Sequence, residues 1–241
     1  MRRFPLSDGP LDPDATAILL PESLVRHVVI VLRLGQGERI TVFDTLGQQR
    51  EGTLRQGPKQ WHLTELSPLI APPPTKNRRH LTLLPALCKA NRFEWMLEKA
   101  TELGVDLIAP LTTTRSVIDW SGKDLSKKLA RMQRIVEEAA RQSGAHNVPR
   151  LLPPLPMAQQ LARLPTPSPL ICFGDPLAQR SLFPLAEDGA LAFASGPEGG
   201  FTPEECAALI AAGAQAVRLG QQILRAETAP IAVAAALRLA E

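Results

Sequence analysis

The sequence predicts an α/β protein in which a small β-barrel precedes a parallel sheet with helices on both faces. Residues 1–72 contain short alternating strands separated by Gly, Asp and Pro, which is typical of small barrels. From residue 80 onward, apolar strands alternate with amphipathic helices, which favours a parallel sheet. The run Ala-Pro-Pro-Pro at 71–74 is a stiff linker, so we predict domains over 1–72 and 76–241.

Composition limits the class of protein. Of the 241 residues, 44% are hydrophobic and 21% charged, which supports a packed core. No stretch reaches the about 18 apolar residues that span a membrane, and the N-terminus lacks an apolar signal core, so we expect a cytoplasmic protein with no membrane association. The three cysteines, Cys88, Cys172 and Cys206, are scattered along the chain, and we interpret them as reduced residues that pack in the core. The four histidines do not have the spacing of metal ligands, so no metal site is predicted.

Positive charge is concentrated in the middle of the chain. Residues 73–150 carry 14 Lys/Arg against 8 Asp/Glu, whereas residues 1–72 carry 8 of each and residues 151–241 carry 5 against 8. This distribution indicates a middle segment that faces a polyanion, although a solvated helix face would give the same count.

Strands and helices are assigned from periodicity and end signals. In the first domain, a helix from Ser23 to Val31, with Ser23 as a possible cap, precedes strands at 39–44, 51–54 and 61–66. In the second, Asn91 is a plausible cap for a helix over 92–103 that Gly104 ends. Its other elements are strands at 80–87, 105–110 and 169–174 and helices at 123–143 and 157–164.

The stretch 190–205 carries the first candidate site. An apolar strand runs into Ser195-Gly-Pro-Glu-Gly-Gly200, and Thr202, Pro203 and Glu205 then form a capping box that opens a helix. The capping box does not account for the three glycines and Glu198 before it, since such glycines allow a ligand to approach free backbone amides. The motif is neither a Walker loop nor a GxGxxG fingerprint, and a simple tight turn would also contain these residues.

A second strand end follows at Leu219-Gly220. The loop after it reaches Arg225 and Glu227, and the last helix over 231–239 is almost wholly apolar. Arg225 would be costly to bury alone, so we expect a partner or a ligand for it. Glu227 lies in the first turn of this helix, where a negative charge interacts favourably with the helix dipole, and it can pair with Arg225. A salt bridge at the start of the helix is therefore the alternative to a catalytic role.

Together, Gly196-Pro-Glu-Gly-Gly200 and Leu219-Gly-x-x-Ile-Leu-Arg-x-Glu-Thr-Ala229 resemble the signature of the 16S ribosomal RNA uridine N3-methyltransferase family, in the trefoil-knotted SPOUT superfamily. Residues 99–105, 114–116 and 142–149 are similar to further family segments, and residues 1–72 resemble its PUA-like RNA-binding barrel. The chain departs from the pattern at Arg141 and Ala145, where the family usually has Glu and often has Arg.

The resemblance implies a knotted fold in which S-adenosylmethionine lies against backbone groups of the two glycine turns. The implied cofactor-binding residues are Phe173, Gly174, Ser195, Gly196, Pro197, Gly199, Gly200, Leu219, Gly220, Ile223, Leu224, Glu227 and Thr228. The implied acceptor is N3 of a uridine, whose proton must leave or whose developing charge must be stabilised. We assign Arg225 to that stabilisation, and Glu198 either to catalysis as base or cofactor positioner, or to holding the turn.

The basic middle is then expected to position RNA through phosphates, which do not select a base. The candidate RNA-binding residues are Arg2, Arg3, Lys89, Arg92, Lys99, Arg115, Arg131 and Arg134. Because aromatic residues make up only 4% of the chain, we expect recognition of RNA shape, on the assembled small ribosomal subunit, by a homodimer.

Three other functions are compatible with the residues. A knotted methyltransferase could act on another RNA position or on a ribose hydroxyl. A non-catalytic RNA-binding protein could keep the same fold, although the intact motifs disfavour it. Disregarding the resemblance, a doubly wound domain could bind another nucleotide at the same strand ends.

Overall fold

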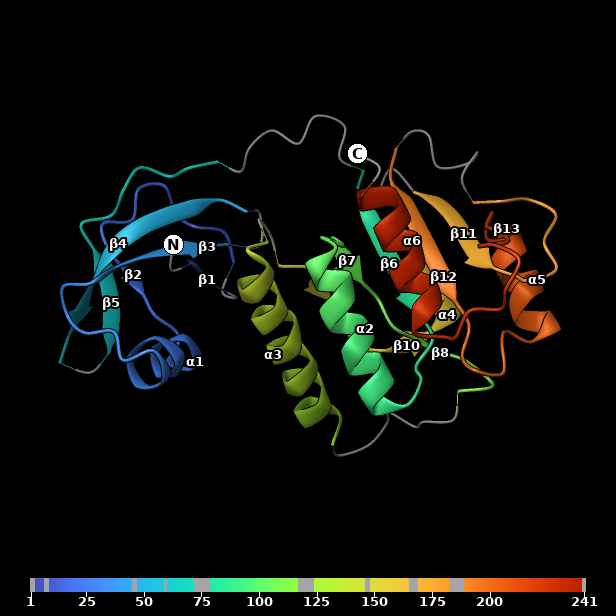
Figure 1. Ribbon diagram of the computed structural model, residues 1–241, viewed down its shortest axis with the longest axis horizontal. Coiled ribbons are helices and arrows are strands. Elements are labelled where there is room, and N and C mark those ends of the chain that lie inside the picture. Colours follow the sequence, from blue (N-terminus) through green and yellow to red (C-terminus); the bar gives the residue numbers. More distant parts are fainter. Residues whose placement is uncertain are drawn as a thin grey trace. The chain divides into compact units, whose positions relative to one another are not determined.

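The structure is a computed structural model that describes residues 3–6, 9–44, 47–58, 60–71, 79–116, 124–145, 148–164, 169–182 and 189–239. The chain forms two compact units (Figure 1). One contains Met1–Lys76 and Ala140–Val148, and the other contains Asn77–Ala139 and Pro149–Glu241. The proline linker lies mostly outside the described residues. The predicted domain limits place Ala140–Val148 in the second domain, whereas this segment belongs to the first unit.

A five-stranded sheet forms the first unit. The strand order is β1-β3-β4-β5-β2, with β1 parallel to β3 and the other pairs antiparallel. Its core is mostly aliphatic, with Val28, Val42, Leu54 and Leu63 fully buried. The strands are β1 (Arg3–Pro5), β2 (Ile18–Leu19), β3 (Arg39–Phe43), β4 (Gln49–Gln56) and β5 (Trp61–Thr64), and the helical segments are α1 (Glu22–Val25) and the π-helical turn η1 (Arg26–Val31).

The sheet corrects two predictions about this unit. Its described strands form an open sheet instead of a closed barrel, because β1 and β2 are its two edges. These edge strands span three and two residues, and among the described strands β1 pairs only with β3 and β2 only with β5. Ser23 does not cap the helix, because Pro21 occupies the N-cap position and the helix begins at Glu22.

The second unit is built on a six-stranded parallel sheet with the order β13-β11-β12-β6-β7-β9. The central strands β6 and β12 are buried at every position, as expected for a sheet that is covered on both faces. The strands are β6 (Leu81–Pro85), β7 (Leu107–Ile108), β9 (Arg150–Leu151), β11 (Leu170–Gly174), β12 (Leu191–Ser195) and β13 (Gln215–Val217), and β8 (Leu111–Thr112) pairs separately with β10 (Leu155–Pro156).

Helices cover both faces of this sheet, as the sequence predicts. On one face, α2 (Ala90–Glu102) and α6 (Thr228–Arg238) lie side by side, and α6 packs against β6 and β12 (Figure 1). On the other, α4 (Met157–Leu161) and α5 (Pro203–Ala211) contribute Met157 and Leu209 to a core that includes Ala192 and Ala194. The helix α3 (Leu125–Ser143) buries Met132, Val136, Ala139 and Ala140.

Helix ends differ from the predictions by a few residues. Lys89, not Asn91, is the N-cap of α2, while Phe93, Met96, Leu97 and Ala100 are buried as predicted. Gly104 ends this helix with a φ of 72°, which confirms its role as the terminating glycine. The last helix starts at Thr228, three positions before the predicted start. Among the described residues, no helix is both long and apolar enough to cross a membrane.

Candidate functional site

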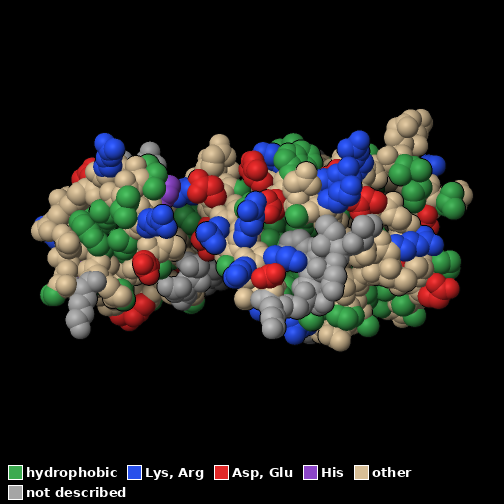
Figure 2. Space-filling model, turned by 90° about the horizontal axis from the view of Figure 1, so that it is seen from below, with side chains coloured by type: hydrophobic (Ala, Val, Ile, Leu, Met, Phe, Trp, Pro, Cys, Tyr) green, Lys and Arg blue, Asp and Glu red, His purple; other side chains and the backbone are tan. Residues whose placement is uncertain are grey.

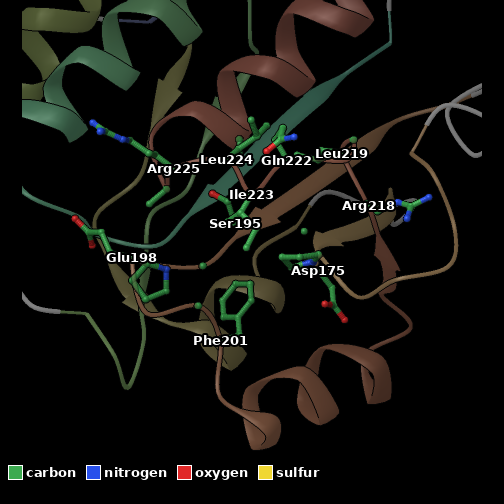
Figure 3. A pocket seen from close by; sticks show the side chains of 18 of the residues that line it. Asp175, Ser195, Glu198, Phe201, Arg218, Leu219, Gln222, Ile223, Leu224 and Arg225 are labelled. Carbon is green, nitrogen blue, oxygen red and sulfur yellow. The ribbon is translucent and has the colours of Figure 1, made fainter.

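A pocket of about 440 Å³ lies in the second unit, where strands β11, β12 and β13 end. Parallel strands place their carboxyl ends at one edge of the sheet, so three chain segments meet there. The loop before α6 closes the pocket (Figure 3). Its lining comprises Arg92, Gly174, Asp175, Pro176, Ser195, Gly196, Pro197, Glu198, Gly200, Phe201, Val217, Arg218, Leu219, Gly220, Gln221, Gln222, Ile223, Leu224, Arg225, Ala226 and Ala229.

The first wall is the glycine turn after β12. A Cβ atom at Gly196 would lie 3.0 Å from the backbone nitrogen of Phe201 and 3.1 Å from the carbonyl carbon of Gly200, so no other residue fits the turn without a shift. Gly200 has a φ of 68° and donates its amide hydrogen to the Pro197 carbonyl over 2.8 Å. The tight turn therefore requires glycine at both positions.

The turn is fixed at its far end by the predicted capping box. The Thr202 hydroxyl accepts from the Glu205 amide, and the Glu205 carboxylate accepts from the Thr202 amide over 2.8 Å. The other Glu205 oxygen accepts from both the amide and the hydroxyl of Thr114. Nearby, the Arg115 guanidinium donates to the Gly199 carbonyl over 2.8 Å. The loop after β8 thus braces the glycine turn.

The second wall is the loop from Leu219 to Ala226. Gly220 has a φ of 147°, and the carbonyl of Arg225 accepts from the amides of Thr228 and Ala229, which begins α6. Ile223 is 80% exposed although it is aliphatic, so its side chain has little protein to pack against. Such a residue on a pocket wall is available to an apolar part of a ligand.

Ser195 is the polar side chain at the centre of the pocket in Figure 3. It is 3% exposed, and its hydroxyl has no hydrogen-bond partner among the described residues. A buried hydroxyl without a partner is costly, so this atom favours a ligand that supplies one.

The pocket has two chemically different ends. In Figure 3, the Arg225 and Glu198 side chains point to the same side, away from Asp175 and Arg218 at the other end. At the first end, the Glu198 carboxylate lies 3.5 Å from a terminal nitrogen of Arg92. The pocket therefore has one end with Arg92, Arg225 and Glu198 and, separated from it, an end with Asp175 and Arg218.

Glu227 and Arg225 do not form the predicted ion pair. Glu227 is 6% exposed, and its Oε1 lies 3.7 Å from Nε of Arg92 instead. Arg225 is exposed, so the predicted cost of burying it does not arise.

The Cys88 thiol lies close to these charges. Burial is the largest cause that raises its pKa, and the negative charges of Glu198 and Glu227 raise it further. Arg92 has a smaller opposing effect, and the resulting pKa is about 12.

The predicted cofactor residues fall into two groups. Nine line the pocket: Gly174, Ser195, Gly196, Pro197, Gly200, Leu219, Gly220, Ile223 and Leu224, as do both predicted catalytic residues, Arg225 and Glu198. Four do not: Phe173, Gly199, Glu227 and Thr228. Phe173 is core and contacts the ring of Phe201 edge-on, and the Gly199 carbonyl accepts from Arg115. These residues support the lining instead of forming it.

Sequence reasoning missed part of the lining. Asp175 and Pro176 follow β11, the strand between β12 and β13, so the rule that parallel strands end at one edge could have found them. The predicted capping box placed Phe201 beside the site but gave it no role. Arg92, predicted to contact RNA, is a pocket residue that is contributed by α2, and no local motif indicated this.

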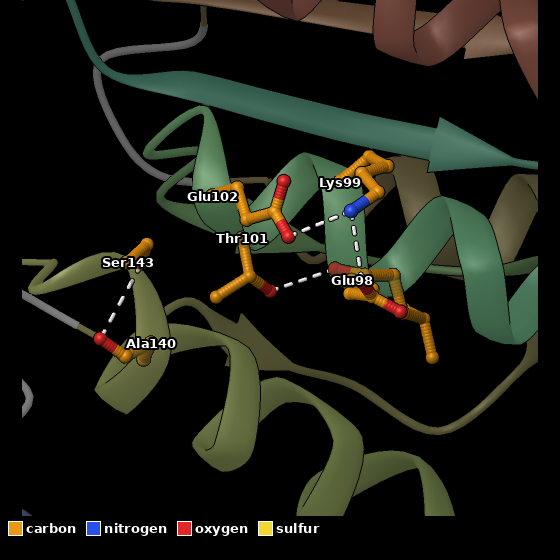
Figure 4. Close-up of polar contacts among 7 residues, drawn as sticks. Glu98, Lys99, Thr101, Glu102, Ala140 and Ser143 are labelled. Carbon is orange, nitrogen blue, oxygen red and sulfur yellow. Dashed lines mark hydrogen bonds and ion pairs between the residues drawn. The ribbon is translucent and has the colours of Figure 1, made fainter.

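Most of the predicted RNA-binding side chains have protein partners. Lys99 donates to Glu98 and Glu102, both over 2.8 Å (Figure 4). Arg131 forms a bidentate pair with Glu94, at 2.5 and 2.8 Å. Arg134 donates to a carbonyl of its own helix, and Lys89 is exposed at the start of α2. Lys and Arg side chains on the face shown in Figure 2 are interspersed with acidic ones. An RNA-binding role for these residues stays a prediction.

Arg3, which was predicted to bind RNA, contacts other residues of the first unit. Its guanidinium donates to the Gly144 carbonyl over 2.9 Å and lies 4.8 Å from the centre of the Phe43 ring. Burial lowers the pKa of Arg3. Arg2, the other residue predicted there to bind RNA, lies outside the described residues.

The fold and the pocket define an α/β protein that binds a small ligand at the carboxyl edge of a parallel sheet. Residues 75–238 match the RNA methyltransferase domain family. "Ribosomal RNA small subunit methyltransferase E" of Mycobacterium bovis is 33% identical over 84% of this chain and 79% of its own length. The protein of that name from Synechocystis is 34% identical over 88% of this chain and 70% of its own length. The chain belongs to this family.

A solved structure supports the same assignment. The crystal structure of a ribosomal RNA small subunit methyltransferase E from Neisseria gonorrhoeae, bound to S-adenosyl methionine, is similar to this chain with a TM-score of 0.79. The two are 34% identical, and the match covers all of this chain and 98% of the other. The mixed α/β architecture with a parallel sheet is therefore that of an RNA methyltransferase structure with bound S-adenosyl methionine.

Proposed function

We propose that the protein transfers the methyl group of S-adenosylmethionine to N3 of a uridine in 16S ribosomal RNA. The observation that carries this proposal is the convergence of two glycine turns on one pocket whose ends differ in charge. Relatives named as small-subunit ribosomal RNA methyltransferases, and one that binds S-adenosyl methionine, support it.

The pocket suits S-adenosylmethionine. Its volume of about 440 Å³ falls in the range of small-molecule sites. Gly196 and Gly200 line the pocket, Ser195 offers a buried hydroxyl, and Ile223 and Leu224 offer apolar contact. When bound, the sulfonium supplies an electrophilic methyl group without a metal ion.

Arg225 and Glu198 act at the acceptor end. Methylation of N3 requires that its proton leave, which places negative charge on the uracil carbonyl oxygens. The exposed guanidinium of Arg225 has no side-chain partner among the described residues and can bind such an oxygen. Glu198 either accepts the proton or holds Arg92, to which it is paired.

The fold and assembly belong to the same proposal. We infer that the second unit is SPOUT-type with its C-terminal part knotted, and that the first unit is a PUA-like RNA-binding module. The substrate is the assembled small subunit, the enzyme acts as a homodimer, and the reaction takes place in the cytoplasm. Shape recognition fits the few aromatic residues in the chain.

Calorimetry with S-adenosylmethionine, followed by mass mapping of methylated nucleotides, tests the proposal. We expect saturable binding and one N3-methylated uridine, formed faster on small subunits than on protein-free 16S RNA. Absence of cofactor binding would overturn the methyltransferase assignment, and a methylated ribose would overturn the N3 assignment alone. Light scattering tests the dimer separately.

A further inference from the structure

Resting on the proposed function, we propose that Arg92 is a second acceptor-end cation, which acts with Arg225 on the two carbonyl oxygens that flank N3 of the target uracil. The sequence places Arg92 among phosphate contacts. The structure places it in the lining of the pocket, at the end where Arg225 and Glu198 lie.

Arg92 is held from two sides. One of its terminal nitrogens lies 3.5 Å from Glu198, and its Nε lies 3.7 Å from Glu227. The side chain is 33% exposed, whereas that of Glu227 is 8% exposed. A largely buried carboxylate on α6 therefore anchors a guanidinium on α2 and leaves part of it open to the pocket.

The ion pairs of Arg92 leave hydrogen-bonding groups of both Glu227 and Arg92 unused. The second oxygen of Glu227 is buried and has no hydrogen-bond partner among the described residues. The contacts to Arg92 are longer than the about 2.7–2.9 Å of a close charge-assisted hydrogen bond. Neither carboxylate therefore saturates the five N–H donors of Arg92, which remain able to bind another acceptor.

Charge balance favours an anion at this end. Arg92 and Arg225 carry two positive charges, and Glu198 and Glu227 carry two negative charges, with Glu227 behind Arg92 and outside the lining. At this end, the pocket surface thus presents two guanidinium groups and one carboxylate. In a partly buried site such preorganised donors stabilise developing negative charge strongly.

Uracil offers two acceptors in the matching arrangement. Carbonyl oxygens flank N3 on both sides, and loss of the N3 proton spreads negative charge over both. The N3 electron pair forms the bond to the methyl carbon, the carbon–sulfur pair stays on sulfur, and the N3 proton leaves to Glu198 or to water. One guanidinium at each oxygen stabilises this charge, whereas cytosine presents an amino group in place of one oxygen and is disfavoured.

The test compares Arg92→Gln, Arg92→Lys and the matched control Arg163→Gln, an exposed arginine that does not line the pocket. Affinity for S-adenosylmethionine, affinity for small subunits, and kcat as a function of pH are measured for each. We expect Arg92→Gln to lower kcat about 100-fold, while both affinities change less than about threefold. Arg92→Lys should recover part of kcat, and Arg163→Gln should match the wild type.

The pH profile separates charge stabilisation from a structural role. The inflection for N3 deprotonation should move to higher pH in Arg92→Gln, because the anion loses one of its two cations. The charged and titratable groups near Arg92 are Glu198 on the glycine turn, Glu227 at the start of α6, Cys88 before α2, and Arg225. All four remain in both Arg92 variants, so they do not account for a difference between them.

A double variant guards against misfolding. Arg92→Gln leaves Glu227 without its counter-charge, whereas Arg92→Gln with Glu227→Gln removes both charges and should restore the fold without restoring kcat. Weaker RNA binding at unchanged kcat would make Arg92 a phosphate contact and overturn the inference. Full activity of the double variant would also overturn it. A wild type that binds cofactor but methylates another atom would remove the uracil role and leave the methyltransferase assignment intact.

Discussion

The Oε1 atom of Glu227 lies 3.7 Å from Nε of Arg92, which joins the start of the last helix to the first turn of α2. Both residues come from segments that the sequence separates widely, and the pair lies at the edge of the pocket. The contact ties the α2–α6 layer to the site, so changes at this pair should affect both stability and function.

Removing Arg92 alone should destabilise the fold. Arg92→Gln leaves a carboxylate that is 8% exposed without its counter-charge, and we expect a loss of about 1–3 kcal/mol, below the value for a fully buried pair because Arg92 is partly exposed. Adding Glu227→Gln should restore most of this loss. Urea unfolding of the wild type, Arg92→Gln, Glu227→Gln and the double variant measures the coupling, and additive losses of stability from the two substitutions would show that the pair has no energetic role.

Arg225→Ala should separate catalysis from cofactor binding. Because its exposed guanidinium lines the acceptor end, we expect kcat to fall about 100-fold or more with little change in S-adenosylmethionine affinity. Single-turnover rates and calorimetry provide the two measurements, with Arg163→Ala as the control of equal charge. A parallel loss of rate and affinity would instead make Arg225 a structural part of the loop.

Gly196→Ala should damage the cofactor wall. The new Cβ would meet backbone atoms at 3.0–3.2 Å, and such overpacking typically costs about 1–3 kcal/mol. We expect affinity for S-adenosylmethionine to weaken about tenfold or more. Gly35→Ala is the matched control, because its Cβ would meet nothing within 4 Å. Unchanged calorimetric affinity in Gly196→Ala would remove the turn from the binding site.

Cys88 should make stability depend on alkaline pH. Its thiol has a pKa raised from 9.0 to about 12, so the unfolded chain loses this proton at a lower pH than the folded protein. The contribution is therefore complete below about pH 9 and is lost as the pH rises from 9 towards 12. Urea unfolding at pH 8 and pH 10 should show a larger drop for the wild type than for Cys88→Ala, and equal drops would contradict the shift.

Local signals predicted much of the architecture. The alternation of apolar strands and amphipathic helices located the parallel sheet, and Thr202, Pro203 and Glu205 located the start of α5, because these features act between residues close in sequence. The short edge strands β1 and β2 carry no such signal, and the described strands form an open sheet where the sequence predicts a small barrel.

The sequence by itself determined the two glycine turns, the apolar strands that lead into them and the family to which the pattern belongs. Only the tertiary structure decided which side chains meet at the pocket. It brought Arg92 from α2 to Glu198 and Glu227, left Arg225 exposed, and added Asp175 from a third strand. The physical reason is that turns and caps depend on neighbouring residues, whereas ion pairs depend on where the packing of sheet and helices places distant ones.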